Sequence, residues 1–199
     1  MSLIESQAPS DPIELFSEWQ LLSKETERFE GTAMALATVD ASGMPSVRMV
    51  LLKDFGQNGF TFFTNFGSRK AADLADNPRA SLMFWWPSMN RQVRIEGTVS
   101  KIDNKDSDAY FSTRPRLSQI STWASEQSKV IENRKILVES MDHLIRKFGE
   151  GSIPRPDYWG GYRLKHDAIE FWANRDNRLH DRILYSRDKD SWRIERLAP

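Results

Sequence analysis

Residues 32–64 contain three short apolar runs, Thr32-Ala-Met-Ala-Leu-Ala-Thr-Val39, Ser46-Val-Arg-Met-Val-Leu-Leu-Lys53 and Phe60-Thr-Phe-Phe-Thr64. Turn-forming residues separate them: Asp40-Ala-Ser-Gly43 follows the first run, and Gly56-Gln-Asn-Gly59 precedes the third. Short apolar runs divided by Gly, Asp and Asn are typical of antiparallel strands joined by tight turns. This stretch therefore predicts a meander of β-strands.

Further strand patterns follow toward the C-terminus. In Gln92–Ile102, Val93, Ile95, Gly97 and Val99 alternate with polar residues, which predicts one buried face. The other predicted strands are Ala80–Trp86, Tyr158–Leu164, Ala168–Ala173, Arg182–Ser186 and Trp192–Leu197. With about seven or eight strands and few crossover helices, we expect a mainly β, α+β fold, an antiparallel barrel with helices packed outside.

Four segments carry helix patterns. Asp11-Pro12-Ile13-Glu14 has the N-cap, first-turn proline and acidic residue of a helix start. A short helix is predicted over Gly67–Asp76 and another over Asn104–Ser112. Apolar residues spaced by three and four from Val130 onward predict one long helix over Glu126–Phe148.

Length and composition favour one globular domain. The chain has 199 residues, 39% hydrophobic and 28% charged, and shows no repeat or long linker. We expect a single domain over 11–199, preceded by a flexible N-terminal segment, 1–10. No run approaches the ~18 apolar residues of a membrane helix, and the N-terminus has no signal-peptide pattern, so we expect a cytoplasmic protein without a membrane partner.

Charge and cysteine content exclude several kinds of function. Lys plus Arg and Asp plus Glu both total 28, for a net charge of +0, so the excess positive charge typical of nucleic-acid binding is absent. Any bound anion must then be met by locally gathered cations. With no cysteine, disulfides, thiolate metal sites and cysteine nucleophiles are excluded, and we expect no metal.

Two short segments could bind anions. Gly67-Ser-Arg69-Lys70 opens a predicted helix, where free N–H groups and two cations favour a phosphate, although ordinary surface cations at a helix start would look the same. Arg48 and Lys53 bracket an apolar strand, and their odd spacing predicts side chains on opposite faces. If both bind anions, two separate anionic groups are implied; otherwise they are strand-end charges that reach water.

Tyr110, Arg114 and Ser118 are spaced by four residues, so a continuous helix would place them on one face. Pro115 disfavours helical geometry at Arg114. A helix end followed by a turn could still bring the three side chains to one anion, with the Arg114 guanidinium as the main donor. The alternative is a helix end with an internally paired arginine.

In Arg178-Leu-His180-Asp-Arg182, strand alternation would place Arg178, His180 and Arg182 on one face. Three such groups together favour a functional role, because they repel unless something anionic or electron-rich lies there. The other two histidines, His143 and His166, are predicted to lie at the surface. Most tryptophans, including Trp85, Trp86, Trp159 and Trp192, are predicted to lie in the barrel core.

Taken together, the ordered motifs resemble those of the pyridoxine 5′-phosphate oxidase family, from about Asp11 to Pro199. The segments that carry the resemblance are Arg48–Lys53, Thr64–Lys70, Arg91–Val93, Tyr110–Gln119, Trp159–Arg163, Glu170–Trp172, Arg178–Arg182 and Arg196–Pro199.

The resemblance implies an FMN-binding split β-barrel that acts as a homodimer, with FMN at the subunit interface. It implies oxidation of pyridoxine 5′-phosphate and pyridoxamine 5′-phosphate to pyridoxal 5′-phosphate, with O₂ reoxidising the flavin and H₂O₂ released. FMN is expected to be non-covalent, since there is no cysteine for a thioether link. The chemistry then belongs to the cofactor, and the protein supplies binding and orientation.

The resemblance also assigns roles to residues. The substrate phosphate would be held by Lys53, Tyr110, Arg114 and Ser118, and Arg178 and His180 would be the catalytic pair over the pyridine ring. The expected FMN contacts are Arg48, Met49, Val50, Leu51, Leu52, Lys53, Phe63, Thr64, Arg69, Lys70, Gln92, Gln127, Ser128, Trp172 and Arg182. Residue 63 is Phe where the family often has Tyr, and Met1–Ser10 contains neither the Arg nor the Tyr that family members often carry near the N-terminus.

Three alternatives remain open from the sequence. A related split-barrel flavoprotein with another substrate would keep the FMN residues, but it has no reason to keep Tyr110, Arg114, Ser118, Arg178 and His180 together. A nucleic-acid-binding barrel could use aromatic residues and arginines, which the neutral charge disfavours. A purely structural or chaperone-like barrel is the third.

Overall fold

Nine antiparallel strands form one connected sheet in the computed structural model, which describes residues 3–199. The strands are β1 (Ala33–Val39), β2 (Pro45–Leu51), β3 (Asp54–Gly56), β4 (Gly59–Asn65), β5 (Arg79–Trp86), β6 (Arg91–Lys101), β7 (Trp159–Ala173), β8 (Asp181–Asp188) and β9 (Ser191–Arg196). The strands expected at 32–64 are confirmed, with the short strand β3 as an addition, but they do not form one meander. β1 pairs with β2 and β3 pairs with β4, and these two hairpins lie at opposite ends of the sheet order.

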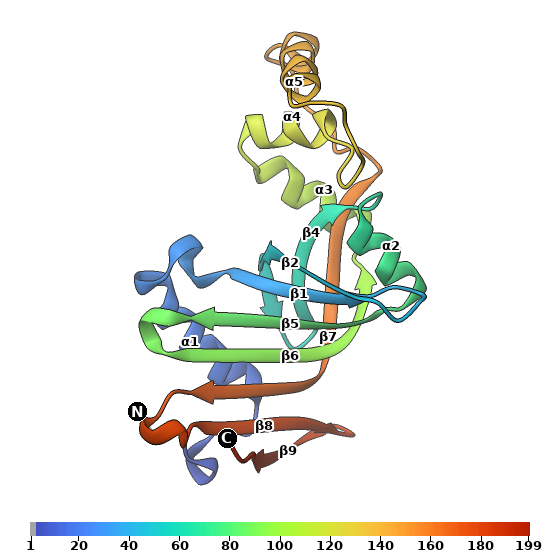
Figure 1. The fold of residues 1–199 in the computed structure, drawn as a ribbon. Helices are drawn as coiled ribbons and strands as arrows, with labels where there is room; N and C mark the ends of the chain where they lie inside the picture. The colour runs from blue at the N-terminus through green and yellow to red at the C-terminus, as the bar shows by residue number, and fades with distance from the viewer. Residues whose placement is uncertain (1–2) are drawn as a thin grey trace.

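The sheet curls into a barrel that is open along one side. Its order is β2-β1-β5-β6-β7-β4-β3. The end strand β2 also contacts β4, although the two are not paired by hydrogen bonds. β7 runs past the barrel, and its C-terminal half pairs with β8, which pairs with β9 (Figure 1). The antiparallel barrel predicted from the sequence is therefore confirmed.

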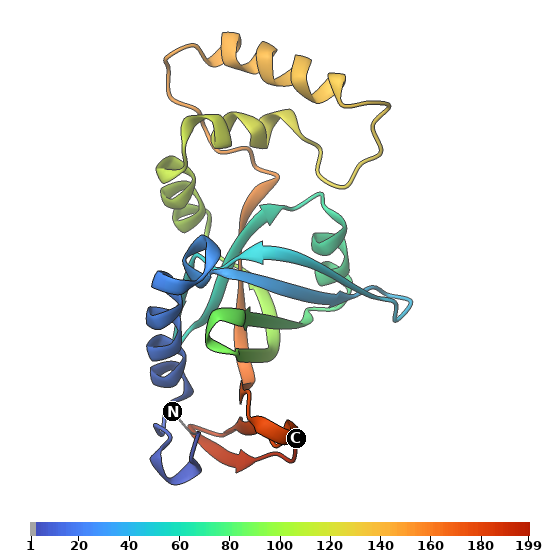
Figure 2. The ribbon, with the colours of Figure 1, turned by 60° about the vertical axis from the view of Figure 1, so that its left-hand side comes forward.

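Five α-helices pack around this sheet in the described part of the chain: α1 (Pro12–Thr26), α2 (Arg69–Asp76), α3 (Asn104–Thr113), α4 (Arg116–Ala124) and α5 (Lys135–Phe148). α1 begins as predicted, since Pro12 is its first residue and the Asp11 carboxylate accepts a hydrogen bond from the Ile13 N–H at 2.9 Å. α1 lies along the barrel, whereas α3, α4 and α5 stack beyond one end of it (Figure 2).

The predicted long helix over Glu126–Phe148 is wrong in its first third. Residues 125–134 form an irregular loop, and α5 begins only at Lys135. Val130, which the periodicity placed on an apolar stripe, is 100% exposed within residues 3–199. α4, which the sequence did not predict, begins directly after Pro115, because proline suits the start of a helix even where it ends the preceding one.

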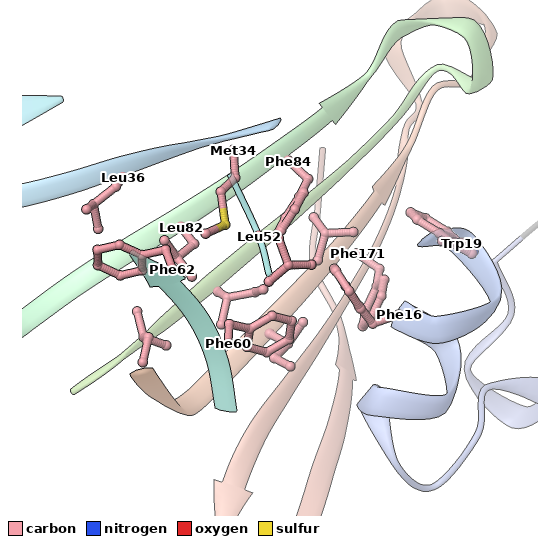
Figure 3. Packing of buried hydrophobic residues seen from close by; sticks show 14 of the residues in the cluster. Phe16, Trp19, Met34, Leu36, Leu52, Phe60, Phe62, Leu82, Phe84 and Phe171 are labelled. Carbon is pink, nitrogen blue, oxygen red and sulfur yellow. The ribbon is translucent and has the colours of Figure 1, made fainter. Parts of the chain in front are cut away.

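The core lies between α1 and the barrel. Phe16 meets Phe60 edge to face with ring centroids 4.9 Å apart, and Trp19 meets Phe171 in the same way at 5.3 Å (Figure 3). The alternation predicted for Gln92–Ile102 is confirmed, since Val93, Ile95 and Val99 are buried. These contacts fix the barrel wall that carries the site described below.

Two predictions about aromatic residues were wrong. Trp85 is 46% exposed, because Phe84 and Trp86 point inward and strand alternation turns Trp85 outward. His166 is fully buried instead of lying on a surface loop, because the two strands expected at 158–173 form one continuous β7. A bulge in the β6–β7 pairing lies beside His166, where Gly97 is required: a Cβ there would be 2.0 Å from the Lys165 carbonyl oxygen.

Residues 3–10, which belong to the segment expected to be flexible, carry specific contacts. Leu3 is 9% exposed and joins the core, and the Tyr185 hydroxyl donates a hydrogen bond to the Pro9 carbonyl at 2.9 Å. Met1 and Ser2 lie outside the described residues. Within residues 3–199, no helix has the length and apolar character needed to cross a membrane.

Candidate functional site

A cavity of about 980 Å³ opens between β2, the end of β4, the start of α2 and the corner that joins α3 to α4. Small-molecule sites in proteins occupy roughly 300–1,000 Å³, so this cavity is large enough for a nucleotide-sized ligand. Most candidate residues from the sequence meet there. Those lining it are Arg48, Met49, Val50, Leu51, Lys53, Phe63, Thr64, Arg69, Lys70, Tyr110, Arg114, Ser118, Gln127 and Ser128.

Lys70 is the most unusual charge in this cavity. It is 7% exposed, and among residues 3–199 its ammonium donates hydrogen bonds only to neutral oxygens: Thr64 Oγ1 at 3.1 Å, Gln127 Oε1 at 3.2 Å and Ser68 Oγ at 3.3 Å. Burial, reinforced by the nearby Arg48 cation, lowers the pKa of Lys70 to about 8. A buried ammonium without a bonded carboxylate is stabilised when an anion binds beside it.

Arg48 is fixed by a different arrangement. Its guanidinium donates to Thr38 Oγ1 at 2.7 Å and lies 3.5 Å from the Asp73 carboxylate, which also accepts from the Thr38 hydroxyl at 2.5 Å. Asp73 is buried, so this one carboxylate offsets part of the charge of Arg48, Arg69 and Lys70. This corner of the cavity keeps an excess of positive charge.

The loop after α4 closes over the same corner. Gln127 Oε1 accepts a hydrogen bond from Thr64 Oγ1 at 3.0 Å, and Ser128 Oγ accepts one from the Arg69 backbone N–H at 3.2 Å, at the start of α2. Ser128 has a positive φ of 74°, an uncommon conformation for a residue other than glycine. The loop therefore brings two hydroxyl or amide side chains to the cation cluster.

A stack of aromatic rings forms the opposite wall. The ring of Phe63 lies 4.0 Å from that of Tyr110 and 5.2 Å from that of Trp159, with nearly parallel planes. The Arg114 guanidinium lies over the Trp159 ring, 4.7 Å from its centroid, and donates to Thr122 Oγ1 at 2.6 Å. Burial lowers the pKa of Arg114. This wall combines flat apolar surface with one half-buried cation.

The α3–α4 corner explains how Tyr110, Arg114 and Ser118 converge. α3 ends at Thr113, and Arg114 is extended (φ −69°, ψ 147°), as expected before a proline. The chain turns at Pro115 into α4, and all three side chains line the cavity. The helix end expected at Arg114 is confirmed, although a second helix takes the place of a simple turn; that the three side chains bind one anion stays a prediction. Thr122 and Trp159 also line the cavity: no sequence motif marks Thr122, and Trp159 was predicted to lie in the barrel core.

The prediction that Arg48 and Lys53 lie on opposite faces was wrong. β2 ends at Leu51, so strand alternation does not extend to Lys53, and both cations line the one cavity. Leu52 turns inward at the strand end: it is 4% exposed, packs in the core and donates its N–H to the Thr32 carbonyl at 2.9 Å (Figure 3). The Leu52 side chain therefore does not reach the cavity.

The remaining candidates form a second group at the far end of β7. Gln92 pairs with Trp172 across β6 and β7, and Trp172 pairs with Arg182 across β7 and β8. The ring of His180 lies 4.6 Å from that of Trp172. Arg182 already has a counter-charge, since its Nε donates to the buried Glu170 carboxylate at 2.8 Å.

The loop that carries Arg178 and His180 is not a strand. β8 begins at Asp181, and 176–178 form a tight turn in which Asn177 (φ 56°) and Arg178 (φ 61°) are left-handed, so strand alternation does not place these side chains. The Arg175 N–H donates to His180 Nδ1 at 3.2 Å. A neutral His180 therefore carries its proton on Nε2.

The two groups are far apart within one chain. Trp159, which lines the cavity, is the first residue of β7, whereas Trp172 is next to its last residue. At about 3.3 Å per residue, 13 steps set an upper limit of about 40 Å on their separation, because β7 bends along its length (Figure 1). The second group lies by β8, at the opposite end of the molecule from α3 and α4 (Figure 1).

Comparison with known proteins gives consistent matches over nearly the whole chain. A family model described as pyridoxamine 5′-phosphate oxidase matches residues 22–145, and one described as pyridoxine 5′-phosphate oxidase C-terminal dimerisation region matches residues 159–199. A pyridoxine/pyridoxamine 5′-phosphate oxidase of Cupriavidus taiwanensis is 50% identical over 199 residues, covering 100% of this chain and 93% of the relative. One of Cyanothece sp. is 48% identical over 198 residues, with the same coverage.

Solved structures agree with these matches. PhzG from Burkholderia lata 383, solved in complex with tetrahydrophenazine-1-carboxylic acid, superposes with a TM-score of 0.92 at 30% identity, over 98% of this chain and 96% of its own. A pyridoxamine 5′-phosphate oxidase-related, FMN-binding protein from Nostoc punctiforme superposes with a TM-score of 0.74 at 18% identity, over 98% and 100% of the two chains, which shows the fold alone.

Proposed function

The chain belongs to the pyridoxamine 5′-phosphate oxidase family, and we propose on that basis that it oxidises pyridoxine 5′-phosphate and pyridoxamine 5′-phosphate to pyridoxal 5′-phosphate, with O₂ as the final electron acceptor and H₂O₂ as the second product. It is an oxidoreductase of the split-barrel fold with FMN as its cofactor. The single observation that best supports the substrate class is the cavity, which joins two clusters of cations to an aromatic wall.

The first cation cluster fits the phosphate of FMN. Lys70 is buried among neutral oxygens, and Arg48 and Arg69 lie beside it with Asp73 as the one buried carboxylate. A phosphate dianion would supply the missing negative charge and accept hydrogen bonds from all three cations. Gln127 and Ser128 would hold the neighbouring part of the cofactor, and the exposed Met49 would offer it an apolar surface.

The second cation cluster fits the phosphate of the substrate. Arg114 and Lys53 lie over rings of the aromatic wall, and the Tyr110 and Ser118 hydroxyls line the same cavity. A guanidinium that is half buried and bonded to a hydroxyl keeps donors for a phosphate at a fixed angle. These four residues therefore bind the substrate by its phosphate and position the ring beside the flavin.

When FMN is bound, the chemistry it supplies is acceptance of a hydride from the C4′ carbon of the substrate at its N5 atom. Arg178 and His180 orient the pyridine ring for that transfer. The hydrogen bond from the Arg175 N–H leaves a neutral His180 with an Nε2–H donor, which suits the ring's phenolate oxygen. The positive charge of Arg178 stabilises the same oxygen.

A homodimer explains how the two distant groups can act together. The match to the C-terminal dimerisation region covers residues 159–199, which include Trp172, Arg178, His180 and Arg182. Within one chain these residues lie at the opposite end of β7 from the cavity. We infer that two copies associate so that the β7–β8 group of one lies against the cavity of the other, with FMN between them.

Two measurements on the purified protein test the function. The visible absorption spectrum should show bound flavin, and heat denaturation should release it into the filtrate as FMN, since binding is non-covalent. Incubation with pyridoxine 5′-phosphate or pyridoxamine 5′-phosphate in air should then produce pyridoxal 5′-phosphate and H₂O₂. A yellow protein that forms no pyridoxal 5′-phosphate from either compound would contradict the proposal.

Variants test the roles of the loop residues. Arg178→Leu should slow the anaerobic bleaching of the flavin by substrate while FMN content stays normal, and His180→Asn should have a milder effect of the same kind. Arg193→Leu is the matched control, because Arg193 is an exposed arginine of β9 that pairs with Glu195 at 3.1 Å. Normal bleaching rates in both loop variants would remove Arg178 and His180 from the site.

The similarity to PhzG keeps one alternative in view, a split-barrel flavoprotein with another substrate. Such a protein needs the FMN phosphate cluster but not the cluster at Arg114. If flavin binds normally and Arg114→Met leaves turnover of the phosphorylated substrates unchanged, the alternative is favoured.

A further inference from the structure

Asp181 lies at the point where the Arg178–His180 loop joins β8, and three donors from different parts of the chain converge on it. Its carboxylate accepts hydrogen bonds from Arg175 Nε at 2.6 Å, from Arg196 Nη1 at 2.9 Å and from the Leu3 backbone N–H at 3.2 Å. Its side chain is 14% exposed. Asp181 therefore links both ends of the loop to the two ends of the chain.

Arg196 extends this link to the N-terminal segment. Its guanidinium forms two contacts with the Glu5 carboxylate, one of them 3.0 Å from Nη2 to Oε2, and donates to the Leu3 carbonyl at 2.7 Å. Burial alone would raise the pKa of Asp181, but the hydrogen bonds from Arg175 and Arg196 outweigh burial and lower it. The carboxylate is thus held in its charged form.

The backbone of the loop 174–180 needs contacts that hold it in place. Asn177 and Arg178 both have left-handed backbone conformations, which are unfavourable for residues other than glycine and persist only where surrounding contacts enforce them. Inside the loop, the Leu179 N–H donates to the Asp176 carbonyl at 3.1 Å and the Arg175 N–H donates to His180 Nδ1 at 3.2 Å. Asp181 adds the strongest contact, a charged hydrogen bond to Arg175.

We propose that Asp181, Arg196 and Glu5 form a clamp that positions the loop 174–180, so that the docked N-terminal segment holds Arg178 and His180 in their working orientation. With Arg175 included, the two carboxylates, Asp181 and Glu5, balance the charge of the two arginines. Without the Asp181 charge, Arg175 and Arg196, which both bond its carboxylate, would repel each other. The clamp residues are positioning residues, and the inference rests on the proposed role of Arg178 and His180 in binding substrate.

The test uses Asp181→Asn in the flavin-loaded, full-length protein. This change keeps the side-chain shape but removes the charge that two arginines share. Charged hydrogen bonds contribute about 1.5–3 kcal/mol, so the rate of anaerobic flavin bleaching by pyridoxine 5′-phosphate should fall about ten- to a hundredfold. Asp167→Asn is the control, because it removes an ion pair of the same 2.9 Å length, to Arg79, that does not touch the loop.

A double-variant cycle separates positioning from general stability. If Asp181 acts through the loop, Asp181→Asn should slow the reaction much less once Arg178→Leu is present. Equal slowing in both backgrounds, or a normal rate for Asp181→Asn alone, overturns the clamp. A normal rate for Arg178→Leu overturns the substrate assignment instead, and the clamp is then decided by the exchange measurement below.

Hydrogen exchange of the flavin-free protein gives a readout that does not depend on activity. Amides of 174–180 should exchange faster in Asp181→Asn, whereas amides of β6 should not change. Glu5→Gln provides a second variant if Asp181→Asn does not fold, since Glu5 is 38% exposed. For such a partly exposed ion pair, the bleaching rate should fall about two- to fivefold. Unchanged exchange across 174–180 in both variants overturns the proposal.

Discussion

His166 should make the protein sensitive to mild acid. Its ring is fully buried in β7, parallel to that of Trp192 at 5.4 Å and edge to face with that of Phe60 at 5.6 Å. Neither ring nitrogen has a hydrogen-bond partner within residues 3–199. Burial, with the nearby Arg187 cation as a further cause, lowers the pKa of His166 to about 4 from an ordinary value of 6.5. The folded protein therefore keeps this imidazole neutral.

The size and sign of the effect follow from this shift. Because the unfolded chain binds a proton near pH 6.5 and the folded chain only near pH 4, acid favours unfolding between these values. Each pH unit of that interval costs about 1.4 kcal/mol, so relative to pH 7 the free energy of unfolding should fall by about 2 kcal/mol at pH 5 and about 3 kcal/mol at pH 4. Full stability is recovered above pH 6.5.

Urea unfolding of the flavin-free protein measures this loss at pH 7, 6 and 5, with protein concentration held constant. The variant His166→Phe keeps an aromatic ring between Phe60 and Trp192 but cannot bind a proton. Its free energy of unfolding should fall less than that of the unchanged protein, and the difference between the two should grow by about 2 kcal/mol from pH 7 to pH 5.

His143→Gln is the matched control, because His143 is exposed on α5. It should lose stability in acid as the unchanged protein does. Carboxylates such as Asp181 also titrate below their ordinary values, which is why the difference between variants is compared and not the total loss. Parallel curves for His166→Phe and the unchanged protein from pH 7 to pH 5 would refute this reasoning.

Three further predictions concern the site and the assembly. Lys70→Met should weaken FMN binding about ten- to a hundredfold in a fluorescence titration. In the unchanged protein, the affinity for FMN should decline as the pH rises above about 8, where Lys70 loses its proton. An affinity for FMN that is independent of pH up to pH 9 would contradict this. Arg114→Met should raise KM for pyridoxine 5′-phosphate about ten- to a hundredfold with normal FMN content. The control Arg116→Met should leave KM unchanged, because the Arg116 guanidinium bonds the Gly151 carbonyl at 2.8 Å. Loss of flavin from Arg114→Met would reassign Arg114 to the cofactor. Light scattering of the flavin-loaded protein should give about twice the 23.0 kDa chain mass, and an active, flavin-loaded monomer would exclude a shared site.

Local sequence signals predicted the elements that depend on neighbouring residues. The Asp11-Pro12 start of α1, the turns around Asp40–Gly43 and the alternation along β6 all follow from backbone and side-chain chemistry within a few residues. The strand runs also predicted an antiparallel barrel. The resemblance to the family identified the candidate site residues, since ordered motifs along the chain carry information that does not require their positions in space.

Other features depended on contacts between distant segments. The stripe at Val130 had helical spacing, but Val130 is fully exposed within residues 3–199, and residues 125–134 form a loop that reaches the start of α2 through Ser128. His166 is buried only because β7 continues without a break under Trp192 and Phe60.

The sequence likewise did not predict that the candidate site residues fall into two separate groups. Arg48 and Lys53 share a cavity because β2 ends at Leu51, whereas Arg178 and His180 lie in a loop at the far end of β7. Residue types and ordered motifs indicated which ligands the chain could bind and which family it resembles. Only the tertiary structure decided which residues meet within one chain, because burial, charge balance and strand ends depend on segments that are remote along the sequence.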